Sequence, residues 1–94
     1  MIRSFRDRRT AALFEGHVVN GVDSRIRKPT RRKLRMLHVA YSLAELAAVP
    51  GNRLEALKHD RAGQHSIRIN DQWRICFVLR DGDAYDVEIV DYHD

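Results

Sequence analysis

The feature that most constrains this chain is the run from Ser66 to Leu79, SIRINDQWRICFVL. Apolar side chains occupy every second position from residue 73 to residue 79, and Arg74 stands at one of the alternate positions. This period of two predicts a β-strand that buries one face. Asp81-Gly82 follows, a dipeptide typical of a tight hairpin turn, and residues 83–90 alternate again. We therefore expect an antiparallel sheet in the second half of the chain.

The first half of the chain favours helices instead. Asp7 is placed to cap a short helix that Gly16 ends. Ser42, with Glu45 three residues later, forms the capping-box pattern of another short helix. Two further strand candidates lie between these helices and the strand expected at residues 73–79, one at residues 53–59 and one at residues 65–70.

A longer helix is expected between the two capped ones. Pro29 lacks an amide proton and is excluded from a helix interior. The helix therefore either starts near Lys28 or begins at Ser24 and kinks. Its apolar stripe is expected to consist of Leu34, Leu37 and Tyr41.

Length and pattern together predict one domain, residues 1–94, of the α+β class. We expect a twisted antiparallel sheet with the N-terminal helices packed on one face. Cys76, the single cysteine, is interpreted as a core residue, because one thiol makes neither a disulfide nor a zinc site. No metal-ligand spacing joins the five histidines, and no metal or cofactor is expected. No apolar run reaches the roughly 18 residues of a membrane span, so a cytoplasmic location without membrane contact is expected.

Positive charge is concentrated in the first half of the chain. Residues 1–40 hold eleven Lys or Arg against three Asp or Glu, whereas residues 41–94 hold six against ten. Seven of the eleven residues from Arg25 to Arg35 are basic. Such a distribution is typical of proteins that bind polyanions, above all nucleic acid. A solvated helix face accounts for the same charges, and composition alone leaves both interpretations open.

Arg74 is the most informative candidate for chemistry. It lies in mid-strand on a partly apolar face, where it needs an anion: a ligand phosphate, or the carboxylate of Glu55 or Glu88. His93 follows the last strand, and histidine is the side chain best suited to exchange a proton near neutral pH. Alternation puts Glu55 and Lys58 on opposite faces, so a bulge or a strand end is needed to bring both to one site.

Several motifs occur in a fixed order in this half of the chain: GNRLEALKHDRAGQHSIRINDQWRICF, the Asp-Gly hairpin, and VEIVDYH. Their set and order resemble the HigB-type toxins of toxin–antitoxin modules, also called plasmid-maintenance killer proteins, in the RelE/ParE superfamily. The resemblance covers essentially the whole chain. It is most specific in the L-K-x-D-R-x-G turn, the Q-W-R-I-x-F strand and the terminal D-Y-H. It implies a small RelE-like fold of the microbial-ribonuclease type.

The resemblance also implies an activity, ribosome-dependent cleavage of mRNA that inhibits translation. The 2′-OH of the mRNA would attack the adjacent phosphate and give a 2′,3′-cyclic phosphate. The implied catalytic residues are Arg74, His93, Glu55, Lys58, Tyr92 and Asp91. Arg74 would stabilise charge on the phosphate, and His93 would protonate the leaving oxygen.

Glu55 departs from the pattern of the best-known members, which carry a histidine at this place. A Glu–Arg–His set occurs elsewhere in the superfamily, and Glu55, Arg74 and His93 follow that order. Glu55 is therefore expected to act as general base, or else to neutralise Arg74. Lys58 would add positive charge.

The implied partners are a cognate HigA-type antitoxin with a helix-turn-helix domain, the 16S rRNA of the small ribosomal subunit, and mRNA. Operator DNA would be bound only through the antitoxin complex. The residues expected to contact RNA are Arg25, Arg27, Lys28, Arg31, Arg32, Lys33, Arg35, Arg61 and Arg68. Two alternatives of other classes stay open: a ParE-like poison of DNA gyrase without nuclease activity, and a non-catalytic nucleic-acid-binding module. Arg74 with Asp91-Tyr92-His93 argues against the gyrase poison.

Overall fold

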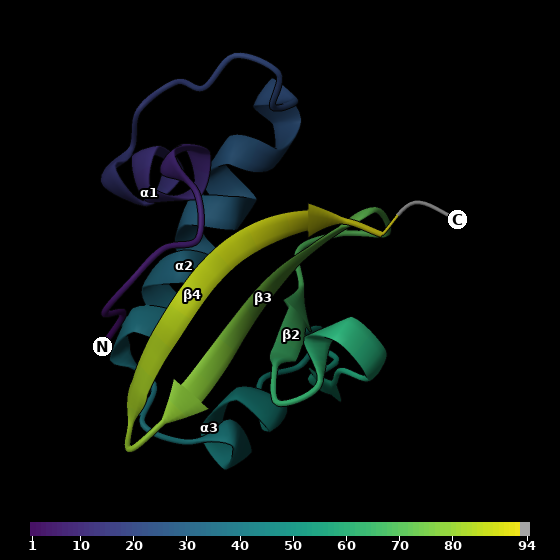
Figure 1. Ribbon diagram of the computed structural model, residues 1–94. Coiled ribbons are helices and arrows are strands. Elements are labelled where there is room, and N and C mark those ends of the chain that lie inside the picture. Colours follow the sequence, from purple (N-terminus) through teal and green to yellow (C-terminus); the bar gives the residue numbers. More distant parts are fainter. Residues whose placement is uncertain (93–94) are drawn as a thin grey trace.

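Four antiparallel strands form the sheet of this α+β fold and neighbour each other in the order β1-β2-β3-β4. This computed structural model describes residues 1–92 of the chain. The strands are β1 (Glu55–Ala56), β2 (His65–Arg68), β3 (Trp73–Arg80) and β4 (Asp83–Asp91). Figure 1 shows β2, β3 and β4 as a twisted meander, with the long strands β3 and β4 side by side.

Three helices precede the sheet in the chain: α1 (Arg8–Glu15), α2 (Arg27–Val39) and α3 (Leu43–Ala47). Two 3₁₀ turns accompany them, η1 (Ser24–Ile26) and η2 (His59–Arg61). α1 and α2 lie together on one side of the sheet (Figure 1). The expected architecture, N-terminal helices on one face of an antiparallel sheet, is confirmed.

The hydrophobic core fills the space between the helices and this face of the sheet. Leu13 of α1 and Leu34 of α2 are buried against Ile75 and Phe77 of β3 and Ile89 of β4. These are the alternate positions that the sequence pattern assigned to the core face. Within residues 1–92, no helix has the length and apolar character needed to cross a bilayer.

The turns and caps follow the local sequence. Asp81 and Gly82 both take positive φ angles, 53° and 81°, as a tight hairpin requires. Asp7 accepts a hydrogen bond from the amide of Thr10 and caps α1, and Gly16 ends that helix at φ 90°. The expected hairpin and first helix are therefore confirmed.

The first residues of the chain run beside β4. Ile2 pairs with Ala84 and Phe5 pairs with Val87, both in parallel. The Oγ of Ser4 accepts a hydrogen bond of 2.9 Å from the amide of Asp86, which itself takes a φ of 52°. The outer edge of β4 is thus covered by the N-terminal segment.

The start of the second helix combines the two expected forms. α2 begins at Arg27, and the 3₁₀ turn η1 precedes it from Ser24. Pro29 is the third residue of α2, where no intrahelical hydrogen bond needs its amide. The cap of η1 is Asp23, whose carboxylate accepts a hydrogen bond from the amide of Arg25.

The expectation that Tyr41 continues the apolar stripe of α2 is wrong. Leu34 and Leu37 are fully buried, but α2 ends at Val39 and Tyr41 is 76% exposed. The backbone of Tyr41 belongs to the next helix, because its amide donates to Oε2 of Glu45 over 3.0 Å. The Glu45 carboxylate and the Ser42 hydroxyl together form the capping box of α3, so α2 does not continue through Tyr41.

Candidate active site and basic surface

The face of the sheet that the helices leave uncovered carries one row of polar side chains. Glu55 pairs with Ser66, Ser66 pairs with Cys76, and Cys76 pairs with Glu88. Residues directly opposite each other in antiparallel strands share a face. Arg74 lies on the same face, two residues before Cys76. One short row therefore brings together side chains from all four strands, among them the candidate residues Glu55 and Arg74.

Arg74 is held firmly in this row. Its Nε donates to Oγ of Ser66 over 2.7 Å, and its Nη2 donates to the backbone carbonyls of Ser66 and Arg53. Oε2 of Glu55 lies 3.7 Å from Nη2, and the Arg74 side chain is only 11% exposed. Of the two expected carboxylates, Glu55 is therefore the partner. Within residues 1–92, these hydrogen bonds use Nε and Nη2 of Arg74. Nη1 is therefore available to donate a hydrogen bond to a ligand.

Glu55 stands at the outer edge of the row with 59% of its side chain exposed. The expected strand over residues 53–59 is wrong, because β1 contains only Glu55 and Ala56. Arg53 and His59 take φ angles of 45° and 56°, in the left-handed region that breaks an extended strand. This short strand presents Glu55 to solvent beside Arg74.

Glu88 is occupied by a different arginine. Nη1 of Arg61, from η2, lies 2.7 Å from Oε1 of Glu88, and Nε of Arg6 lies 3.8 Å from the same oxygen. The hydrogen bond from Arg61 to Glu88 raises the pKa of that guanidinium. Because Glu88 is paired with Arg61 and Arg6, it does not form the ion pair with Arg74.

Tyr92 reaches this face through Cys76. The phenol oxygen of Tyr92 lies 3.7 Å from Sγ of Cys76, which is fully buried as expected. Burial, together with the contact to Cys76, raises the pKa of Tyr92 to about 12. Burial likewise raises the pKa of the Cys76 thiol. Both groups are therefore protonated at neutral pH, so Tyr92 donates hydrogen bonds and Cys76 is no thiolate nucleophile.

Two other candidate catalytic residues, Asp91 and Lys58, do not join this row. Asp91 pairs with Trp73, which places it on the opposite face, and its Oδ2 accepts from Nε2 of Gln72 over 3.0 Å. Lys58 is exposed and precedes η2. His93 lies outside the described residues. Within residues 1–92, no three His, Cys, Asp or Glu side chains are grouped as metal ligands.

The basic residues of η1 and α2 lie mainly on the solvent side of the helical layer. The exposed ones are Arg25, Lys28, Arg31, Arg32 and Arg35, and Arg27 is half-buried. Arg25 forms an ion pair of 2.7 Å with Asp23. Arg68, on the uncovered face of the sheet, pairs with Asp71. The expected RNA contacts thus fall on two faces of the molecule.

Lys33 differs from its neighbours because its ammonium points into the protein. Nζ donates to Oδ1 of Asn52 over 2.5 Å. Burial lowers the pKa of this ammonium, and the charges of Arg32 and Arg68 lower it further. Lys33 therefore has a structural partner that the sequence did not suggest.

Asn52 is one of the buried polar residues that the sequence did not indicate. It is fully buried, and its Nδ2 donates to the carbonyl of Leu46 over 2.9 Å and approaches Sδ of Met36. The backbone carbonyl of Asn52 accepts a hydrogen bond from the backbone amide of Arg68 over 2.7 Å. Asn52 thus joins α2, α3 and β2 immediately before Arg53, the residue whose carbonyl holds Arg74.

Comparison with known proteins gives a consistent result over the whole chain. The sequence model described as "RelE-like toxin of type II toxin-antitoxin system HigB" matches residues 3–93. The chain is 36% identical over 97 residues to "Endoribonuclease HigB" of Proteus vulgaris, covering 99% of this chain and all of that one. It is 40% identical over 63 residues to "Toxin HigB-1" of Vibrio cholerae, covering 67% of this chain and 66% of that one.

Solved structures agree on the fold. A chain of the heterotetrameric YoeB–YefM toxin–antitoxin complex from Staphylococcus aureus superposes with a TM-score of 0.61 at 17% identity, covering 100% of this chain and 99% of that one. A second structure of a YoeB–YefM complex gives a TM-score of 0.56 at 16% identity. At these identities the likeness concerns the backbone arrangement alone.

Proposed function

This chain belongs to the HigB-like family of RelE-like toxins of type II toxin–antitoxin systems, and from that premise we propose that it is an endoribonuclease that cleaves mRNA on the ribosome. The observation that carries the proposal is Arg74. It is fixed by Ser66 and the Arg53 carbonyl on the uncovered face of the sheet, with Nη1 left for a phosphate oxygen. The name of the Proteus vulgaris relative supports the same activity.

The reaction begins when the 2′-OH of one nucleotide attacks its own 3′-phosphate. Glu55 takes the hydroxyl proton, and the P–O bond to the next 5′-oxygen breaks to give a 2′,3′-cyclic phosphate. Negative charge builds on the phosphate oxygens, and Arg74 stabilises it from a position that needs no rearrangement. The exposure of Glu55 and its distance of 3.7 Å from Arg74 support a base that meets RNA directly. The competing role of Glu55 is simple neutralisation of Arg74.

The remaining residues act on the leaving group and on the RNA itself. His93 protonates the departing 5′-oxygen. Tyr92 positions or stacks the RNA as a neutral phenol, a role supported by its pKa of about 12. Lys58 adds positive charge near the strand end, and Asp91 orients the tail.

The setting follows from the family. A toxin of a type II system has an antitoxin as its partner, and we place this antitoxin in the HigA class with a helix-turn-helix domain. Operator DNA is bound through that complex. The basic surface of η1 and α2 contacts 16S rRNA of the small subunit in the cytoplasm, where phosphates give affinity that falls with salt.

Expression of Arg74→Ala and His93→Ala beside the wild type tests the proposal. We expect growth arrest with in-frame mRNA cleavage for the wild type, and a loss of cleavage by roughly 10²–10³-fold for Arg74→Ala. Arg80→Ala is the matched control, because Arg80 lies on the same strand but stacks over Tyr85 at 4.5 Å. Circular dichroism and thermal unfolding establish that each variant folds.

Undiminished cleavage by both site variants would reject the mechanism. Loss of DNA supercoiling without mRNA cuts would support the gyrase alternative. RNA binding with neither effect would support the non-catalytic module.

A further inference from the structure

The backbone carbonyl of Arg53 is one of the acceptors that hold the guanidinium of Arg74, whose Nη2 donates to it over 2.5 Å. Arg53 lies outside the sheet, because β1 begins only at Glu55. It is exposed and takes a φ of 45°, in the left-handed region that an arginine rarely adopts. A backbone conformation of this kind persists only where the surrounding structure enforces it. The direction of this acceptor is therefore set by its neighbours in the chain.

Asn52, the preceding residue, is fixed at every polar group. Its amide donates to the carbonyl of Val49 over 3.2 Å, and its backbone carbonyl accepts from the amide of Arg68 over 2.7 Å. Its Nδ2 donates to the carbonyl of Leu46 over 2.9 Å, and its Oδ1 accepts from Nζ of Lys33 over 2.5 Å. The residue is fully buried. These hydrogen bonds tie the start of the turn to α2, α3 and β2, so the next residue has little freedom to rotate.

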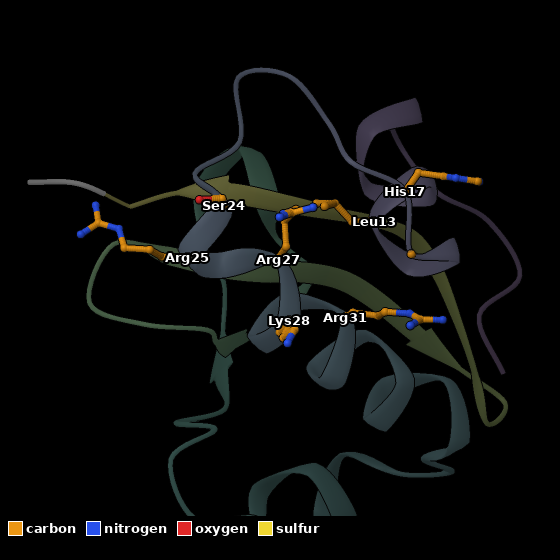
Figure 2. Close-up of a pocket in the computed structure, with 8 residues that line it drawn as sticks. Leu13, His17, Ser24, Arg25, Arg27, Lys28 and Arg31 are labelled. Carbon is orange, nitrogen blue, oxygen red and sulfur yellow. The ribbon is translucent and has the colours of Figure 1, made fainter.

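Lys33 takes part in this arrangement although it belongs to the basic helix. Figure 2 shows Arg27, Lys28 and Arg31 of α2 around a pocket between α1 and the start of α2. The ammonium of Lys33 donates to Asn52 instead, in the interior of the protein. The contact between Lys33 and Asn52 is therefore separate from the basic surface, and what it supports is the turn at residue 53.

The second anchor of Arg74 does not fix the guanidinium by itself. Oγ of Ser66 accepts from Nε over 2.7 Å, and the carbonyl of Ser66 accepts from Nη2 over 3.3 Å. Both acceptors belong to one residue of β2, so the guanidinium can still turn about them. The Arg53 carbonyl supplies a third acceptor from a different segment of the chain. A catalytic group displaced by about 1 Å can lose about 10²-fold in rate.

We propose that Asn52 is a positioning residue for RNA cleavage, which acts on Arg74 through the Arg53 carbonyl. The inference rests on the proposed function, in which Arg74 stabilises charge on the phosphate. The buried Asn52 side chain does not meet the RNA. It holds the acceptor in place, so that the Arg74 guanidinium has its catalytic orientation before the substrate binds.

Single-turnover cleavage of mRNA on ribosomes tests the role, because it separates the chemical step from binding. Thr10→Val is the matched control for Asn52→Ala. Thr10 is also fully buried, and its Oγ1 accepts from the amide of Ile89 over 3.1 Å, on the covered side of the sheet. We expect Asn52→Ala to slow cleavage by roughly 10–100-fold. Its affinity for the ribosome, and both quantities for Thr10→Val, should change by less than about threefold.

Lys33→Met separates positioning from stability. It removes the ammonium that Asn52→Ala leaves without an acceptor, so the double variant should have a higher urea midpoint than Asn52→Ala. The turn at residue 53 still lacks the Asn52 side chain, and the cleavage rate of the double variant should therefore stay low. Cleavage that recovers together with the midpoint would overturn the proposal, since it would mean that Asn52 acts on stability alone.

A second readout needs no cleavage. The Nε–H signal of Arg74 in proton–nitrogen NMR spectra, assigned by its loss in Arg74→Lys, should shift or broaden in Asn52→Ala and stay in place in Thr10→Val. An unchanged signal in Asn52→Ala would overturn the proposal, because the guanidinium would then keep its place without Asn52.

The double variant Arg74→Ala with Asn52→Ala tests the route of the effect. It should cleave as slowly as Arg74→Ala alone, because a residue that acts through Arg74 has nothing left to position. A further loss of rate would contradict that route. Undiminished cleavage by Arg74→Ala alone would instead reject the catalytic proposal, and the NMR comparison would still decide whether Asn52 places Arg74.

Discussion

Asn52→Ala is expected to be the most damaging single substitution outside the core apolar residues. The Asn52 side chain accepts from Nζ of Lys33 and donates to the carbonyl of Leu46, and no part of it reaches solvent. Alanine removes both interactions and can replace neither. The Lys33 ammonium then lacks its acceptor in a half-buried position, and the Leu46 carbonyl lacks a donor.

The magnitude follows from the two groups left behind. An unsatisfied buried polar group costs about 1–3 kcal/mol, and a charged one lies at the upper end. The sum, with a small cavity, is a loss of about 3–4 kcal/mol in the free energy of unfolding. A domain of this size has a total of roughly 5–14 kcal/mol. The melting temperature should therefore fall by about 12–25 °C.

Urea unfolding of four proteins measures the effect: wild type, Asn52→Ala, Lys33→Met, and the double variant. Lys33→Met removes the charge that Asn52 accepts from, so in the Asn52→Ala background it should restore about 1–2 kcal/mol. Asn20→Ala, in an exposed turn, is the control and should change the free energy of unfolding by less than about 0.5 kcal/mol.

Two results would refute this reasoning. One is a cost of Asn52→Ala below about 1 kcal/mol, which would mean that water satisfies both groups. The other is strict additivity in the double variant, which would mean that Lys33 and Asn52 do not interact in solution.

Three further predictions concern titration and charge. Hydrogen bonds from Arg25 hold the pKa of Asp23 at about 2, below the ordinary 3.8, so its contribution to stability is present above pH 3.8 and is lost as the pH falls toward 2. Asp23→Asn should weaken the pH dependence of the urea unfolding midpoint between pH 3.8 and about 2. A pH dependence equal to that of the wild type would contradict the pairing of Asp23 with Arg25. The raised pKa of Tyr92 gives stability that is complete below pH 10 and lost as the pH rises through about 12. A spectrophotometric titration should show a tyrosine that ionises near pH 12, and Tyr92→Phe should abolish that step; a titration without it would count against the Cys76 contact. Charge reversal of Arg32 and Arg35 should weaken ribosome binding and flatten its salt dependence, whereas an unchanged salt slope would identify a merely solvated face.

Local patterns were sufficient for the two long strands, β3 and β4, and for the core face of β3. Ile75 and Phe77 are fully buried because alternation in a strand is imposed by the backbone itself, wherever the strand lies. The hairpin at Asp81-Gly82 was equally local, since few residues tolerate two positive φ angles. The helical period predicted Tyr41 as part of the apolar stripe of α2, but α2 ends at Val39. The amide of Tyr41 donates instead to Glu45 of α3, which is capped by Ser42.

The partner of Arg74 required long-range information. Sequence offered Glu55 and Glu88 with equal merit, and the choice depends on Arg61, which arrives from the η2 turn and occupies Glu88. Asn52 follows Pro50-Gly51, a pair typical of turns, and nothing beside it in the chain indicates full burial. Its partners lie on α2, α3 and β2, which only the folded arrangement brings together.

The N-terminal segment beside β4 has a consequence for the time at which the protein can fold. Ser4 meets Asp86 across 82 positions of sequence, so this contact cannot form before β4 has been synthesised. β4 is also the main partner of β3, and it supplies Ile89 and Val87 to the core. Contacts between residues so far apart in sequence close a long loop. The loss of chain entropy on closing it slows folding. A chain truncated before β4 should show no cooperative unfolding transition, so a nascent chain has no assembled active face before β4 has been synthesised.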